Sequence, residues 1–206
     1  RTDGTGDVNV TANTWNDNLT LQTSSGILSI SGTQTMGANT LTLSADSDIA
    51  LTGALTGTGT LNVKQTTAST TMGLGNAATG TLNLTATEIG LITNGWGNLV
   101  FGRTDGTGDV NVTANTWNDN LTLQSETGII TGSGTQTMAA NNLTMTTASD
   151  LALNGALTGT GTLTIQSAAA ATSYGLGTGQ TGTVQLSNAE IANITNGWSS
   201  LVFGIT

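Results

Sequence analysis

The 206-residue chain contains no cysteine, histidine or proline, and only 7% of its residues are charged. Without cysteine or histidine it has no thiolate or imidazole ligand for a metal, and no Ser–His or Cys–His nucleophile pair. The lack of cysteine also excludes disulfides. Proline removes a backbone donor from a central strand, so its absence agrees with a chain built from sheet.

Positive charge is also scarce, because three basic residues stand against twelve acidic ones, for a formal net charge of −9. Such a chain has no basic surface that could bind nucleic acid or anionic lipid. The acidic excess favours solubility. No apolar run approaches the roughly 20 residues that a membrane-spanning helix needs. We therefore expect no nucleic-acid partner and no membrane insertion.

What the chain does contain is an internal repeat. RTDGTGDVNVTANTWNDNLTLQ at 1–22 recurs without a single change at 103–124. LTGALTGTGTL at 51–61 returns as LNGALTGTGTL at 153–163. A fixed period of 102 residues (1 to 103) without insertions is typical of an array in which each unit stacks on the last.

The repeat sets the expected domain organisation. We predict one β-solenoid unit over 1–102 and a second over 103–204, with 205–206 standing where a third would start. We accordingly interpret the chain as two units of a longer protein.

Alternation of apolar and polar residues is the dominant local signal. It appears as LTL at 19–21 and 41–43, LNV at 61–63 and LNL at 82–84, each typical of a short half-buried strand. Thr- and Gly-rich composition is also compatible with disorder, but the 36% of apolar residues keep a register that a disordered tract has no reason to keep. The best helical candidate, 85–92, is too short to predict a helix of useful length.

The strands recur at nearly constant spacing. Their leading apolar residues are Leu19, Leu41, Leu61, Leu82, Leu99 and Leu121, with steps of 22, 20, 21, 17 and 22 residues. This spacing predicts about five coils of roughly 20 residues per repeat, with Leu19 to Leu82 in one interior column.

Each coil carries three apolar groups, which favours a roughly triangular cross-section. The predicted fold is all-β, a right-handed parallel β-helix, since parallel crossovers are right-handed. The sequence allows two inward-facing registers for one strand, because Ile30 of the first copy is replaced by Gly132 in the second. There the alternative inward residues are Ile27 and Ile129.

The four tryptophans recur at two positions of the repeat, as Trp15 with Trp117 and Trp96 with Trp198. In one interpretation they form an aromatic stack that fills a wide corner of the core. In the other they form an exposed aromatic platform that binds sugar. We prefer the first interpretation.

The motif DGTGD places Asp3 and Asp7 in the first copy, and Asp105 and Asp109 in the second, around a tight turn. Alternating aspartate and glycine is found in calcium loops. The motif lacks both the nonapeptide repetition of calcium-binding β-rolls and EF-hand spacing. We therefore predict a solvated turn and no metal site, and keep these four residues as the calcium alternative.

Catalysis has little support in the sequence. The pair Asp46 and Asp48 is not repeated, because position 46 becomes Ala148 in the second copy. Glu88 and Glu190 do match, but each stands alone along the chain. Glycoside cleavage requires clustered acids. We predict no catalytic residue and no cofactor.

Longer stretches of the repeat have a familiar pattern. ITNGWxxLVFGRTDGTGDVNV, then NDNLTLQ, then LTLxxxxDIALxGALTGTGTL resembles the repeats of large filamentous-haemagglutinin-type exoproteins, which are bacterial adhesins of the two-partner secretion kind. The resemblance implies a right-handed parallel β-helix shaft, secreted and folded outside the cell. It also implies a role in adhesion, biofilm or surface filaments. It assigns no catalytic or binding residue to this chain.

The sequence thus predicts a structural rod segment of a secreted or cell-surface adhesin or extracellular filament, without enzymatic activity. Its expected partner is itself, through end-to-end stacking or filament assembly. The alternative is a glycan-binding shaft that recognises surface glycans through exposed Trp, Asn and Thr faces.

Overall fold

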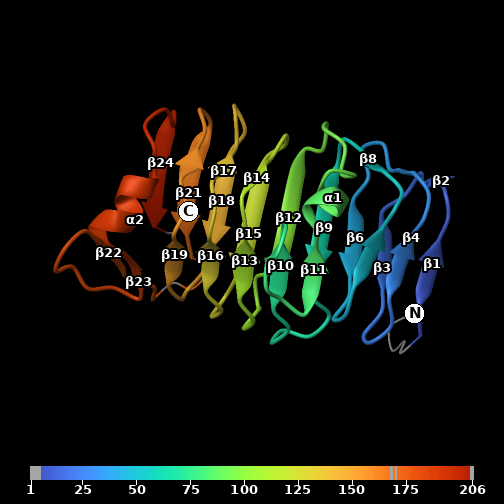
Figure 1. Cartoon of the computed structure of the whole chain (residues 1–206), viewed down its shortest axis with the longest axis horizontal. Helices are drawn as coiled ribbons and strands as arrows, with labels where there is room; N and C mark the ends of the chain where they lie inside the picture. The colour runs from blue at the N-terminus through green and yellow to red at the C-terminus, as the bar shows by residue number, and fades with distance from the viewer. Residues whose placement is uncertain (1–5, 168, 170, 205–206) are drawn as a thin grey trace.

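The structure, a computed structural model, describes residues 6–204 apart from 168 and 170. Short strands follow one another along a single long axis, with the N-terminus at one end and the C-terminal strands near the other (Figure 1). Every strand pairing among the described residues is parallel. The all-β parallel solenoid predicted from the alternation is confirmed at this level.

The longest sheet runs the length of the molecule and has eight strands. In order they are β3 (Leu19–Gln22), β6 (Leu41–Ser44), β9 (Thr60–Lys64), β12 (Asn98–Arg103), β15 (Leu121–Ser125), β18 (Leu143–Thr146), β21 (Thr162–Gln166) and β24 (Ser200–Gly204). One register holds throughout, so that the leucines at matching positions form an unbroken column: Leu19, Leu41, Leu61, Leu99, Leu121, Leu143, Leu163 and Leu201. Its six internal members are buried. A column of this kind fills the interior because each coil covers the apolar stripe of the next.

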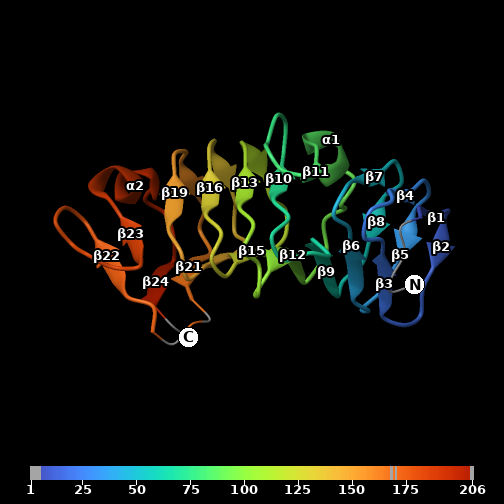
Figure 2. The same cartoon turned by 90° about the horizontal axis from the view of Figure 1, so that it is seen from below.

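The other two faces carry shorter strands (Figure 2). One face holds β1 (Val8–Val10), β4 (Leu28–Ile30) and β7 (Ile49–Leu51), then β11 (Leu82–Leu84), β10 (Met72–Leu74), β13 (Val110–Val112), β16 (Ile130–Gly132) and β19 (Leu151–Leu153). The other holds β2 (Asn13–Thr14), β5 (Gln34–Thr35) and β8 (Leu55–Thr56), then β14 (Asn115–Thr116), β17 (Gln136–Thr137) and β20 (Leu157–Thr158). A separate pair, β22 (Tyr174–Leu176) and β23 (Val184–Leu186), lies near the C-terminal end.

The predicted five coils per repeat are wrong for the longest sheet, which advances by four strands per repeat. Leu99 pairs with Leu61, not with Leu82. Leu82 instead pairs with Met72, only ten residues earlier, on a different face. The reason is that β10 and β11 form a parallel pair within one coil, and β11 is tied back to β7 by the bridge between Asp48 and Asn83. Alternation identified the strand correctly but carried no information on its face.

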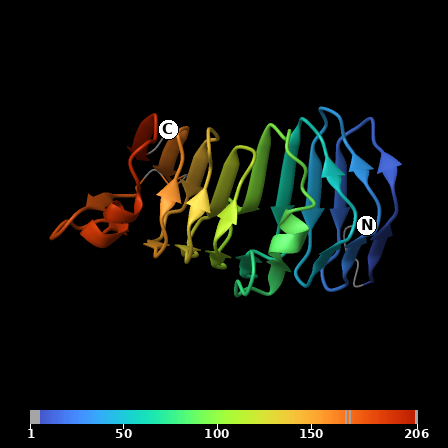
Figure 3. The same ribbon diagram turned by 45° about the horizontal axis from the view of Figure 1, so that its top comes forward.

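This enlarged coil also contains a helix that the sequence did not predict. Helix α1 (Ala86–Ile89) has a capping box, in which the Thr85 hydroxyl accepts from the Glu88 amide and the Glu88 carboxylate accepts from Thr85. Helix α2 (Asn188–Asn193) repeats the arrangement with Ser187 and Glu190. The two reciprocal bonds satisfy amides that a four-residue helix would otherwise leave unpaired. Figure 3 shows both helices on the same side of the solenoid.

The register at Gly132 is also settled. Ile27 and Ile129 are 44% and 40% exposed, so the alternative that they point inward is wrong. Ile30 is fully buried, and Gly132 occupies the same inward position in β16. A Cβ atom added at Gly132 would have no atom within 4 Å, so the second repeat contains unfilled space where the first has a side chain.

Candidate functional site at the repeat junction

The three acidic candidates for calcium binding that the structure describes are each engaged in other contacts. Asp7 and Asp109 accept a hydrogen bond from the amides of Ile27 and Ile129, both at 2.8 Å. Asp105 pairs with Arg103 at 2.8 Å, which lowers the pKa of its carboxyl. Asp3 lies outside the described residues. Within residues 6–204, as far as they are described, no three acidic side chains gather where they could hold a metal ion.

The tryptophans take two distinct environments. The Nε1 of Trp117 donates to Gln136 Oε1 at 2.9 Å, and its ring lies 5.6 Å from that of Phe101. The Nε1 of Trp96 donates to the Leu55 carbonyl, and its ring packs directly over Gly57. Trp96 and Trp117 are 3% and 1% exposed, so neither offers the open platform that the glycan interpretation requires. The ring contact of Trp117 is with Phe101, and the described residues show no ring contact between tryptophans.

Trp15 and Trp198, the equivalent tryptophans nearer the two ends of the chain, make the same hydrogen bonds but are less buried. Trp15 donates to Gln34, and Trp198 donates to the Leu157 carbonyl. Both rings are half-buried. Each of the four tryptophans thus holds a corner of the coil through a buried or part-buried hydrogen bond, as a packing role requires.

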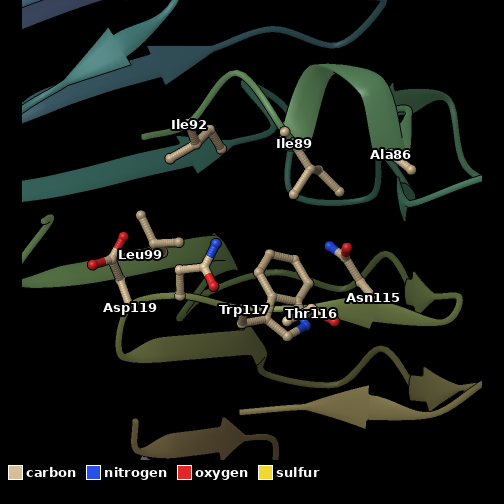
Figure 4. A pocket seen from close by; sticks show the side chains of 10 residues that line it. Ala86, Ile89, Ile92, Leu99, Asn115, Thr116, Trp117 and Asp119 are labelled. Carbon is tan, nitrogen blue, oxygen red and sulfur yellow. The ribbon is translucent and has the colours of Figure 1, made fainter. Parts of the chain in front are cut away.

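A small pocket of about 90 Å³ opens where the first repeat meets the second (Figure 4). One wall comes from α1 and the segment that follows it, with Ile89 and Ile92. The facing wall comes from β14 and the turn after it, with Asn115, Trp117 and Asp119. On this face Leu55 bridges to Ile92 instead of pairing with a strand of the next coil, so the sheet is interrupted between β8 and β14. The pocket lies at this interruption.

Asp119 is the charged group of the pocket and is only 6% exposed. Its Oδ1 accepts from the Gly95 amide at 2.8 Å. Burial raises the pKa of this carboxyl, while hydrogen bonds from the Gly95 and Trp96 amides act in the opposite direction. The carboxylate therefore ties the end of the first repeat to the start of the second.

Asn115 lies on the other side of the Trp117 ring (Figure 4). Its Nδ2 is buried and has no hydrogen-bond partner in the protein. Buried donors are almost always paired with protein or ordered water, so this amide is one of the exceptions among the described residues.

Sequence inspection could not find this site. Asn13 and Asp17 are the identical residues of the first copy, yet both are exposed, because no preceding helix faces them in the described structure. The environment of Asn115 differs from that of Asn13 because α1 lies opposite β14. The signal is therefore tertiary and is not carried by the motif.

Sequence reasoning also missed an acidic pair. Glu88, treated as isolated along the chain, lies close enough to Asp48 for its charge to help burial raise the pKa of that carboxyl. In the second copy Asp150 and Glu190 line one pocket together. Glu88 and Glu190 are committed to helix caps, and each also accepts from the backbone amide of the adjacent strand, at Leu51 and Leu153. Their role is to dock the helices.

Comparison with protein-family models, curated proteins and solved structures found no match. The resemblance to filamentous-haemagglutinin-type repeats therefore stays a prediction. Among the described residues no helix has the length and apolar character needed to cross a membrane.

Proposed function

We propose that this chain is a rod segment of a long, secreted bacterial surface adhesin or extracellular filament, and that its work is mechanical. The observation that supports the proposal most strongly is the eight-stranded ladder, which passes through the repeat junction without a change of register. Because backbone hydrogen bonds run along the axis from coil to coil, such a ladder resists extension and leaves few loops open to proteases.

On two faces the strand pairing crosses the junction as it does within a repeat, while on the third face the sheet is interrupted between β8 and β14. Strand β12 pairs with β15 over five residues, and β10 pairs with β13 over three. The finer features of the proposal are a right-handed path, which parallel crossovers favour, and three strands in each regular coil. At about 4.8 Å per coil, four coils advance the rod by roughly 19 Å per repeat.

End-to-end association of separate chains belongs to the same proposal. β22 and β24 occupy the positions of β10 and β12 in the second copy, and their Leu176 and Leu201 are 40% and 48% exposed. Those strands can receive β1 and β3 of another copy as β10 and β12 receive β13 and β15. Unpaired parallel edges of this kind template further pairing.

Length measurement tests the rod directly. Polypeptides of two, four and six repeats are compared by small-angle X-ray scattering at low concentration. We expect the longest dimension to grow linearly, by roughly 19 Å per added repeat, at constant cross-section. A cross-section that grows with repeat number would show that the repeats fold back on one another, and would remove the mechanical role.

Location is tested separately. Antibodies raised against the folded polypeptide should label the outer surface of intact cells of the source organism or their extracellular filaments. Labelling only after the cells are opened would refute the extracellular assignment without touching the rod architecture.

A further inference from the structure

Two exposed turns of the chain share the sequence Asn-Gly and the same place in the repeat, at Asn94–Gly95 and at Asn196–Gly197. We propose that Asn196 is a site of spontaneous deamidation, and that Asp119 protects Asn94 from the same reaction. The inference does not rest on the rod function, because it concerns the chemistry of two turns within one folded chain.

Deamidation at Asn-Gly is an intramolecular substitution. The backbone nitrogen of the glycine attacks the side-chain carbonyl carbon of the asparagine, and the new C–N bond closes a succinimide ring. The bond from that carbon to the side-chain nitrogen breaks, and ammonia leaves with the proton of the glycine amide. Water then opens the ring to an aspartyl or isoaspartyl residue. Glycine favours the attack because it has no Cβ atom to obstruct it.

Each turn is held on its own repeat in the same way. The two glycines have φ values of 127° and 130°, in the left-handed region that glycine adopts without strain. Trp96, which follows the first turn, donates its Nε1 to the Leu55 carbonyl at 3.3 Å. Trp198, which follows the second, donates to the Leu157 carbonyl at the same distance. Both asparagines and both glycines are exposed, so water reaches both sites.

The turns differ at the glycine amide. The Gly95 amide donates to Asp119 Oδ1 at 2.8 Å, whereas no carboxylate of the described residues accepts from the Gly197 amide. Attack requires the glycine nitrogen to lose its proton. A carboxylate that accepts a hydrogen bond from this N–H opposes the loss, because the amide anion would face a negative charge. The hydrogen bond also fixes the orientation of the Gly95 nitrogen and so restrains its approach to Asn94.

A third Asn-Gly, at Asn154–Gly155, provides an internal reference. A Cβ atom at Gly155 would overlap the backbone of Gly134, so the two coils are in close contact there. The Asn154 amide donates to the Gly132 carbonyl at 2.8 Å, which holds this turn on the preceding coil. We expect slow deamidation at Asn154 that does not respond to changes at residue 119.

The identical block makes the protection a property of the repeat. Asp119 belongs to the block at 103–124, and Asp17 is the same residue of the first block. A turn that is followed by such a block is protected, and a turn without one is open to reaction. An isoaspartyl residue lengthens the backbone just before Trp198, so the reaction would disturb the corner of the coil that this ring holds.

Peptide mapping by mass spectrometry measures the two turns separately, because Gly97 follows the first Asn-Gly-Trp and Ser199 follows the second. The polypeptide is kept in dilute, mildly alkaline buffer, and deamidation at each asparagine is followed with time. Asp119→Ala removes the acceptor at the first turn. Asp17→Ala is the matched control, since Asp17 is exposed in the identical block. Asp119→Asn removes the charge but keeps an acceptor oxygen, and circular dichroism checks the fold of every variant.

We expect Asn196 to deamidate about tenfold faster than Asn94 in the unaltered chain, as for the loss of one charge-assisted hydrogen bond. Asp119→Ala should raise the Asn94 rate toward that of Asn196, and Asp119→Asn should give an intermediate rate. Neither variant should change the rate at Asn154, and Asp17→Ala should change none of the three.

The proposal is wrong if Asn94 reacts as fast as Asn196 in the unaltered chain. It is also wrong if Asp119→Ala leaves the Asn94 rate unchanged in a folded protein. An equal rise at Asn94 and Asn154 in Asp119→Ala would overturn it as well, since both turns would then be reporting the opening of the coils.

Discussion

Filling the space at Gly132 should stabilise the protein. This residue lies at the inward position of β16, between Val112 of β13 and Leu153 of β19 in the ladder. The first repeat has Ile30 there, fully buried. A Cβ at Gly132 would meet nothing within 4 Å, and the backbone is not in the left-handed region that favours glycine.

The expected gain for Gly132→Ala has two parts. Burying one methyl group contributes about 0.8 kcal/mol. Replacing glycine within a strand contributes roughly another 0.5–1 kcal/mol, because the unfolded chain loses freedom. The free energy of unfolding should therefore rise by about 1.5 kcal/mol, which for a chain of this size raises Tm by roughly 3–6 °C. Gly132→Val should add about 1.5 kcal/mol more.

Urea and thermal unfolding followed by circular dichroism measure the change. Gly134→Ala is the matched control, since a Cβ there would lie 2.6 Å from the Ala114 backbone nitrogen. That clash should lower stability by roughly 1–3 kcal/mol. If Gly132→Ala is neutral or destabilising while Gly134→Ala is tolerated, the assigned inward register of β16 is wrong.

Three further changes test individual contacts. Gln136→Leu should lower the free energy of unfolding in urea by about 3 kcal/mol, because it leaves Trp117 Nε1 and two part-buried carbonyls without their partner. A loss below about 0.5 kcal/mol would contradict this hydrogen-bond network. Gly57→Ala should cost roughly 1–3 kcal/mol and change the near-ultraviolet spectrum, since its Cβ would lie 2.7 Å from the Trp96 ring; an unchanged spectrum and Tm would place that ring elsewhere. Burial, and then the charge of Glu88, raise the pKa of Asp48 above 3.8, so the folded state binds this proton more tightly than the unfolded state. The stability that this proton binding contributes is complete below pH 3.8 and is lost as the pH rises through the folded-state pKa of Asp48. In a plot of urea midpoint against pH, Asp48→Asn should therefore flatten the decline above pH 3.8. Identical plots for the variant and the unaltered chain would refute the raised pKa.

The fold class could be predicted because period-two alternation and β-branched residues directly encode half-buried strands. Leu19, Leu41 and Leu61 are in one column as expected, since each lies in a coil of about 20 residues with the same turn chemistry. Leu82 is not, because its alternation satisfies burial on any face, and contact with β10 decides which face it joins.

Helix α1 was missed for a related reason. Its four residues give no helical period, and it depends on a capping box and on docking of Ile89 into the core. The pocket was beyond sequence reasoning altogether, since Asn13 and Asn115 sit in identical blocks and differ only in what faces them. Tertiary apposition, which no local pattern encodes, creates the site.

The solenoid requires strands that stack in one register along the longest sheet, which has four strands to a repeat. Spin labels on cysteines introduced at Thr20 of β3 and Thr164 of β21 measure this directly by pulsed electron resonance, since both side chains face outward from the sheet, between buried or half-buried apolar neighbours. Six inter-strand steps predict a separation of roughly 29 Å between the two labelled backbone positions. A value near 34 Å would indicate a fifth coil in the repeat, and a broad distribution without a peak near either value would contradict the solenoid itself.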